Sequence, residues 1–330
     1  MTHAVLGIDI AKLTFDACLI RPDGSLRHRT RFANSPAGFT ELAAWLKKHH
    51  VTTTHACLEA TSTYAAALAR DLLERAHRVS VVNPARIHDF GKSRLTRTKT
   101  DKADAELIAR FCLTQTPPAW TPPLPEITEL QGLIRHLETL EAARQQHANQ
   151  LATATTQIVR DSLTALIRHL EGQVVEVEAA ITEHIARHPD LRADVALLVS
   201  IPGIGERTAA RLLAEIIHLK SYASARQVAA YAGVSPQQRE SGTSVRGKTQ
   251  LSKTGNARVR RAVYLPAVVA KRYNPLIKAL CERLAERGKP PMVQIGAAMR
   301  KLLHLAYGVL KSRKPFDPNY GRPQQQPHAA

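Results

Sequence analysis

Four acidic residues in the first third of the chain have the type and spacing to bind metal ions. Asp9 lies in an otherwise apolar run, and Glu59 ends another. Asp101 and Asp104 are three residues apart at the start of a predicted helix, so they share a face. Four carboxylates gathered in one place would partly protonate unless cations lay between them. Oxygen ligands of this number suit Mg²⁺ or Mn²⁺, and two such ions can assist the displacement at a phosphodiester.

Each acid also has an ordinary structural interpretation. Asp101 could cap its helix, Asp104 could be a solvated acid of the first turn, and Glu59 could simply end a strand. The case for a metal site therefore depends on all four acids meeting. A basic segment flanks the last two, and it could hold a nucleic-acid backbone or be only a solvated loop. Its cations are Lys92, Arg94, Arg97, Lys99 and Lys102.

Two glycines in the second half of the chain predict a contact with phosphate. Gly203 and Gly205 flank one apolar residue between two helical patterns, as in a helix-hairpin-helix, whose turn presents backbone N–H groups to a phosphate. Arg207 and Thr208 follow at the start of the second helix. The alternative is a plain packing corner between two helices.

A long polar segment, residues 235–256, contains a candidate nucleophile. Hydroxyls, glycines and cations alternate in it, as in a loop that brings a nucleophile to a phosphate. Composition does not distinguish Ser241 from Ser244, and the segment could instead be a loop that only contacts DNA. The predicted nucleic-acid ligands here and just beyond are Arg246, Lys248, Lys253, Arg258, Arg260 and Arg261.

The elements expected to position the acids alternate in type. Strands are predicted at 5–10, 15–20, 28–32, 55–60 and 78–82, and helices at 39–50, 64–76 and 101–114. Three antiparallel strands followed by alternating helices and strands are typical of an α/β ribonuclease-H-like domain, here residues 1–115. In that fold the first and fourth strands are neighbours, so Asp9 and Glu59 would meet beneath the last helix.

The rest of the chain reads as mainly helical. Five prolines mark a linker at 116–126, and helical periodicity over 127–188 predicts two long helices, either a coiled-coil arm that binds a partner or a packed pair within one monomer. A mainly α domain is expected at 189–320 and a disordered tail at 321–330.

Charge and composition narrow the class of protein. Residues 191–330 carry 24 Lys and Arg against 7 Asp and Glu, a net charge of +17, whereas residues 1–190 carry 22 against 21, a net charge of +1. So uneven a charge favours a nucleic-acid partner. No apolar run is long enough to cross a membrane, no secretory signal is visible, and four isolated cysteines indicate reduced thiols rather than a zinc site. We expect a cytoplasmic protein.

Six motifs resemble those of the insertion-sequence transposases related to the Piv invertase, across residues 3 to 320. They are G-I-D-I-A-K from Gly7, C-L-E-A-T from Cys57, V-N-P-A from Val82, K-T-D-K-A-D-A from Lys99, S-I-P-G-I-G from Ser200 and E-S-G-T-S-V-R-G from Glu240. The resemblance implies a RuvC-like D-E-D-D domain, in which Asp9, Glu59, Asp101 and Asp104 bind the metal, and a transposase domain in which Ser241 is the nucleophile.

The same resemblance implies partners and a reaction. It implies homodimers or homotetramers, donor and target DNA, and in some members a structured noncoding guide RNA. Attack by Ser241 would leave a phosphoserine link that allows rejoining without ATP. The competing interpretations are a Holliday-junction-type metal-dependent nuclease that uses water, and a non-enzymatic nucleic-acid-binding protein.

Overall fold

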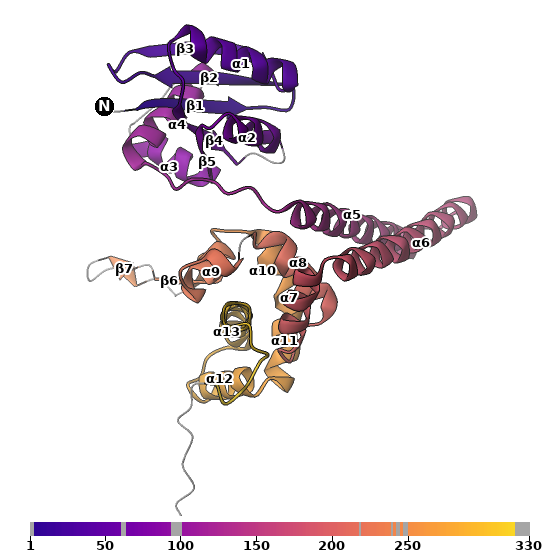
Figure 1. Ribbon diagram of the computed structural model, residues 1–330. Helices are drawn as coiled ribbons and strands as arrows, with labels where there is room; N and C mark the ends of the chain where they lie inside the picture. Colours follow the sequence, from indigo (N-terminus) through magenta and orange to yellow (C-terminus); the bar gives the residue numbers. More distant parts are fainter. Residues whose placement is uncertain are drawn as a thin grey trace, which may run out of the picture. The chain divides into compact units, whose positions relative to one another are not determined.

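The computed structural model describes residues 3–60, 64–93, 101–217, 219–238, 240–241, 245–246 and 250–320. The tail predicted at 321–330 lies outside these residues. The chain divides into two compact units, Met1–Pro122 and Pro123–Ala330, which are taken one at a time below. Figure 1 shows both units and labels elements of each.

A five-stranded mixed sheet forms the centre of the N-terminal unit. The strands are β1 (Ala4–Ile10), β2 (Thr14–Ile20), β3 (Leu26–Ala33), β4 (Thr54–Glu59) and β5 (Arg78–Val82), in the order β3-β2-β1-β4-β5. The first three strands pair antiparallel, while β4 lies parallel to β1 and to β5. The turn between β2 and β3 contains Gly24, whose positive φ of 83° suits glycine.

Four helices cover the two faces of this sheet. They are α1 (Pro36–Lys48), α2 (Tyr64–Glu74), α3 (Pro84–Ser93) and α4 (Asp101–Gln115). Alternate residues of β1 divide between the faces: Leu6 and Ile8 pack with α1 and α2, whereas Val5 packs with α3 and α4. The predicted mixed α/β sheet is therefore confirmed, but the prediction omitted α3. Asn83 and Pro84 follow the predicted strand 78–82 and end it, but proline also suits the first position of a helix.

The proline-rich segment begins as part of the N-terminal unit. The backbone N–H of Trp120 donates to the carbonyl of Val79, at 2.7 Å, and the Ser80 hydroxyl donates to the carbonyl of Pro118, at 2.8 Å. Residues 117–120 thus lie alongside β5 and are hydrogen-bonded to it. The helix that follows begins at Pro125, inside the predicted linker 116–126.

Two long helices open the C-terminal unit. α5 (Pro125–Thr153) and α6 (Gln157–Arg187) contact each other. Their buried apolar residues are Leu130, Ile134 and Leu137 on α5, and Val174 and Ile181 on α6. These all lie toward the ends nearest the rest of the unit, whereas Ile158 near the start of α6 is 75% exposed.

Shorter helices complete this unit around α13. They are α7 (Pro189–Val199), α8 (Glu206–Glu215), a 3₁₀ turn at Leu219–Ser221, α9 (Ala225–Tyr231), α10 (Ala257–Ala262), α11 (Tyr264–Tyr273), α12 (Pro275–Glu286) and α13 (Pro291–Ser312). α13 contacts α7, α9, α11 and α12, and it buries Leu302 and Leu303 completely. The mainly helical character predicted for this part of the chain is confirmed. Over the residues that the structure describes, no helix is both long and apolar enough to cross a membrane.

Candidate active site

The register of two parallel strands makes Asp9 and Glu59 neighbours. Ile8 of β1 aligns with Leu58 of β4, so the acids that follow them stand side by side at the carboxyl edge of the sheet. Residues aligned in this way point to the same face, which for this pair is the face of Gly7 and of its aligned partner Cys57. Both acids are partly buried.

Helix α4 crosses the same face and runs opposite to the two strands. The thiol of Cys112 donates to the carbonyl of His55 at the start of β4, at 3.7 Å. Eight helical residues separate Cys112 from Asp104, a rise of about 12 Å. Four strand residues separate His55 from Glu59, a rise of about 13 Å. The helix therefore brings the partly buried Asp104 to the same level as Glu59.

Gly7 allows this helix to approach the sheet closely. A Cβ atom at position 7 would lie 2.2 Å from the backbone nitrogen of Ala109 and 2.3 Å from the carbonyl oxygen of Ala105. Only glycine permits such contact between a strand and the backbone of a helix. Gly7, two residues before Asp9, thus sets how closely α4 packs against the sheet.

Carboxylates at one edge of a sheet are suitable ligands for a hard divalent cation. The side chain of Asp101 lies outside the described part of the chain, although its backbone begins α4. Among the side chains that are described, no group of three or more His, Cys, Asp or Glu is arranged to hold a metal ion. The gathering of Asp9, Glu59 and Asp104 rests on register and helix direction, and the four-acid metal set stays a prediction.

The predicted basic rim is described only in part. Lys92 is exposed in the last turn of α3, and Lys102 lies in the first turn of α4, where its side chain is not described. Arg94, Arg97 and Lys99 lie outside the described residues.

The second glycine motif forms the turn between α7 and α8. Gly203 has a φ of 108°, and a Cβ there would lie 2.7 Å from that of Ala270 on α11, so this glycine serves the packing of the turn. Gly205 caps α8 and borders open space. Thr208 is partly buried. Arg207 is half exposed and forms ion pairs with Glu141 of α5 and Glu178 of α6.

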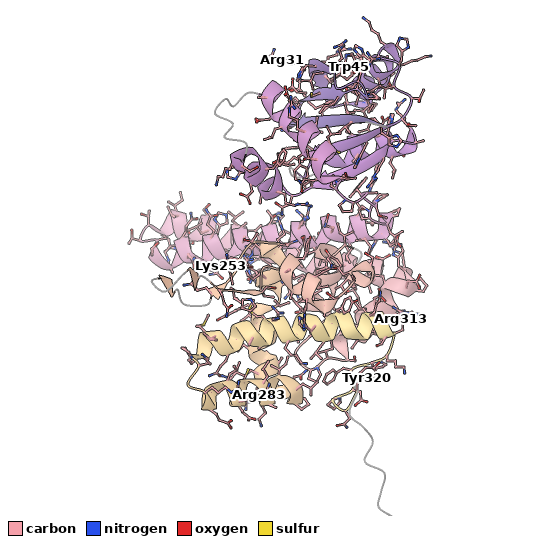
Figure 2. The ribbon with its side chains drawn as sticks, turned by 90° about the vertical axis from the view of Figure 1, so that its left-hand side faces the viewer. Arg31, Trp45, Lys253, Arg283, Arg313 and Tyr320 are labelled. Carbon is pink, nitrogen blue, oxygen red and sulfur yellow. The ribbon has the colours of Figure 1, made fainter. Side chains whose placement is uncertain are left out.

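Short paired strands organise the polar segment, here called the serine hairpin (residues 236–251). β6 (Pro236–Gln237) pairs with β9 (Gln250–Leu251), and β7 (Glu240–Ser241) pairs with β8 (Val245–Arg246). The backbone of Ser241 pairs with Val245, while the side chains of Ser241 and Arg246 are not described. Ser244 and Lys248 lie outside the described residues. Lys253, labelled in Figure 2, is exposed just after the hairpin.

Like Arg207, two further predicted nucleic-acid ligands contact the protein itself. Arg258 pairs with Glu138 of α5, at 2.6 Å, and is partly exposed. Arg260 donates to the backbone carbonyls of Ala232 and Lys253, at 3.2 and 3.1 Å, so it holds two chain segments together. Arg261 is exposed.

Comparison with known proteins gives the family. The family model for IS110 transposases of the D-E-D-D type matches residues 6–160. A second family model, "Transposase IS116/IS110/IS902 family", matches residues 195–282. A pilin gene-inverting protein from Moraxella bovis is 36% identical over 331 residues, which cover 96% of this chain and 98% of that protein. The chain belongs to the IS110/IS116 transposase family. The transposase for insertion sequence element IS1328 from Yersinia enterocolitica is 27% identical, over 86% of this chain and 87% of its own length.

Membership makes this transposase a DNA-recombining enzyme, as the motifs predicted. The first model covers the whole N-terminal unit after residue 5, and its D-E-D-D label indicates dependence on a divalent metal. The second model runs from within α7 to within α12, and so includes the glycine turn and the serine hairpin.

Sequence reasoning missed one acid of the transposase that faces Asp9. Asp16 lies opposite Asp9 in the β1–β2 ladder and is only 7% exposed. Its carboxylate accepts from the backbone N–H of Arg31, at 3.3 Å, where Arg31 has a φ of 59°. The available signal was a carboxylate inside an apolar strand predicted to pair with the strand of Asp9.

Two buried thiols join the elements that carry Glu59 and Asp104. Cys57 of β4 and Cys112 of α4 share a hydrogen bond, and this bond together with burial raises the pKa of the Cys57 thiol well above its ordinary value. Cys57 therefore stays protonated, and the two buried thiols pack against each other between strand and helix.

Proposed function

We propose that this transposase cuts and rejoins DNA with Ser241 as nucleophile, beside a metal site formed by Asp9, Glu59, Asp101 and Asp104. The observation that carries the proposal is the parallel register of β1 and β4, crossed by an antiparallel α4. That arrangement supports a site in which acids from three distant parts of the sequence meet at one edge of the sheet. The strand order β3-β2-β1-β4-β5 supports a ribonuclease-H-like, RuvC-like assignment of this unit.

The serine step balances without an external energy source. The Ser241 oxygen forms a bond to a backbone phosphorus, the bond from phosphorus to the 3′ oxygen breaks, and a proton passes from the serine to the leaving 3′ oxygen. Two Mg²⁺ or Mn²⁺ ions, when bound, would activate the attacking oxygen and stabilise the leaving one. Because the phosphoserine link keeps the phosphodiester energy, a second 3′ hydroxyl can displace Ser241 without ATP.

The rest of the C-terminal unit supports contact with nucleic acid. We infer that the α7–α8 turn acts as a helix-hairpin-helix, with N–H groups at the start of α8 facing a phosphate beside the open side of Gly205. Lys253 and Arg261 are exposed cations within residues 191–330, the part of this unit that carries the net charge of +17. Lys92 and Lys102 flank the acids in the N-terminal unit.

We also infer that the enzyme acts as a dimer or tetramer with donor and target DNA. The arm of α5 and α6, whose outer part exposes Ile158 and Val159, would serve as a coiled coil between subunits. A structured guide RNA would bind the basic half. Sequencing any RNA that copurifies with the protein tests this: a uniform, structured RNA species is expected, and random cellular RNA would refute guidance.

A covalent trap tests the proposed chemistry. Labelled DNA incubated with Mg²⁺ should form an adduct that survives denaturing gels in the wild type and in Ser244→Ala, and no adduct in Ser241→Ala or Asp101→Asn. Omitting the divalent metal should abolish the adduct as well. Efficient cleavage by Ser241→Ala would instead indicate a nuclease that uses water, and DNA left intact by every form would indicate a binding protein.

A further inference from the structure

The serine hairpin begins and ends at a tightly bonded base, defined here as residues 231–236 and 250–256. Apart from the β6–β9 pairing, three backbone hydrogen bonds close it. Ser252 donates to Ser235 at 2.9 Å, Lys253 donates to Gly233 at 3.1 Å, and Asn256 donates to Tyr231 at 2.6 Å. The two chain segments that carry the hairpin are therefore held together along their length.

Glycine permits this close approach. Gly255 has a φ of 142°, and a Cβ there would lie 2.3 Å from the carbonyl oxygen of Tyr231. Gly233, with a φ of 68°, faces the guanidinium of Arg260 at a would-be Cβ distance of 2.6 Å. The base has no room for side chains at these positions, so its geometry is closely constrained.

A polar cluster around the buried Glu215 contacts this base. Glu215, at the end of α8, is 3% exposed. The Asn256 amide donates from Nδ2 to Oε2 of Glu215, at 3.2 Å, and to the hydroxyl of Tyr231, at 3.1 Å. That hydroxyl in turn donates to the backbone carbonyl of Glu215, at 3.0 Å. Burial raises the pKa of Tyr231, so its hydroxyl remains protonated as a donor.

The other oxygen of Glu215 binds the arm. Arg135 of α5 donates from Nε to Oε1, at 3.0 Å. One turn before it on α5, Gln131 donates to the carbonyl of Ala214, at 2.9 Å, and nearly one turn after it Glu138 accepts from Arg258 of α10. A single face of α5 thus contacts the end of α8 and the start of α10, on either side of the cluster.

We propose that Arg135, Glu215 and Asn256 are positioning residues that couple the arm helix α5 to the base of the serine hairpin. The inference rests on the proposed role of Ser241, because it explains what holds the hairpin that carries this residue. A buried carboxylate is costly unless its partners are well placed, so the cluster favours one relative position of arm and hairpin. A partner that displaces the arm would displace the hairpin with it.

The substitution Asn256→Asp removes the role of this residue in the polar cluster but keeps its role as the cap of α10. The Oδ1 atom of Asn256 caps α10 by accepting from the N–H groups of Arg258 and Val259, and aspartate keeps that function. Aspartate loses the Nδ2 donor and places a second carboxylate beside Glu215. Asn274→Asp is the matched control, since Asn274 caps α12 in the same way and donates from Nδ2 to the carbonyl of Pro202.

Hydrogen exchange of the peptide covering residues 250–256, measured without DNA, tests the coupling. Exchange should be roughly tenfold faster in Asn256→Asp and also in Arg135→Met, because a hydrogen bond to a charged group is lost in each. Exchange in Asn274→Asp should match the wild type. Wild-type exchange in the Arg135→Met and Asn256→Asp variants, with the fold intact by circular dichroism, would overturn the coupling.

The rate of covalent adduct formation tests the positioning role. At saturating DNA the rate constant should fall at least tenfold in Arg135→Met, while the Kd for DNA stays within about twofold, because a small displacement of a nucleophile slows chemistry more than binding. An unchanged rate in a variant with faster exchange would overturn this role. A wild-type protein that forms no Ser241-dependent adduct would overturn the proposed function and the positioning role with it, whereas the exchange result would still decide the coupling.

Discussion

Gly7→Ala should uncouple the acid site from the sheet that supports it. The added Cβ would lie 2.2 Å from the nitrogen of Ala109 and 2.3 Å from the oxygen of Ala105, against the 3.4 Å of an ordinary contact. Both atoms belong to the backbone, so no rotamer change removes the overlap. Helix α4 would have to withdraw by about 1 Å, and such overpacking typically costs about 1–3 kcal/mol.

The withdrawal acts on chemistry more than on folding. Since α4 carries Asp101 and Asp104, while Asp9 and Glu59 stay on the sheet, the distance between the two pairs grows. A misplacement of about 1 Å can slow an enzymatic step by about 100-fold. We expect Gly7→Ala to lower the urea midpoint modestly and to reduce the rate of metal-dependent adduct formation by about that factor.

Two further variants make this prediction refutable. Gly132→Ala, at an exposed position of α5 with open space around it, should raise the free energy of unfolding by about 0.5–1 kcal/mol and leave activity unchanged. Ala109→Gly should fail to rescue Gly7→Ala, because the overlap is with backbone. Wild-type activity in Gly7→Ala, or its recovery in the double variant, would show that α4 does not rest on Gly7 as described.

Two other predictions concern charge. Burial, reinforced by nearby cations, lowers the pKa of His304 below its ordinary 6.5, so the unfolded chain takes up a proton first as pH falls, and stability is lost below about pH 6.5. The urea midpoint should therefore drop between about pH 7.5 and 5.5, and this drop should be smaller in His304→Gln. An equal drop in both proteins would contradict the prediction. Glu141→Gln removes a carboxylate that pairs with Arg207 and Arg211, at 2.5 and 2.6 Å. The affinity for DNA, measured by fluorescence anisotropy, should rise, and the slope of log K against log salt concentration should steepen by the equivalent of up to about one phosphate contact. Weaker binding would mean that these arginines serve only to hold helices α5 and α6.

The N-terminal sheet was predictable because its signals are local. Short β-prone runs, and alternation in residues 28–32, indicated the strands, and the neighbouring positions of Asp9 and Glu59 followed from the expected topology. Asp16 escaped notice because a single carboxylate within a strand has no meaning until its cross-strand partner is known. Helix α3 escaped because Asn83 and Pro84 suit a turn as well as a helix start; the Asn83 side chain accepts from the N–H of Ala85.

The roles of the basic residues were much less predictable. Arg258 and its partner Glu138 are 120 residues apart, so no local pattern reveals their ion pair. Arg260 lies in a helix whose composition suggests a DNA-binding surface, yet its guanidinium binds two backbone carbonyls. Glu215 and Arg135 likewise meet only through the fold. Sequence composition predicts that a surface is basic, whereas the fold decides which cations remain available to a partner.

The short stretch that leaves the N-terminal unit also bears on solubility. A sheet with exposed edges can recruit strands from other molecules and aggregate. Here the edge at β5 is shielded by the protein's own residues 117–120, through Trp120 and Val79. The opposite edge, β3, displays the exposed Arg27 and Arg31, whose like charges repel an identical strand. Edge-to-edge pairing between copies of the sheet is thereby discouraged at both edges.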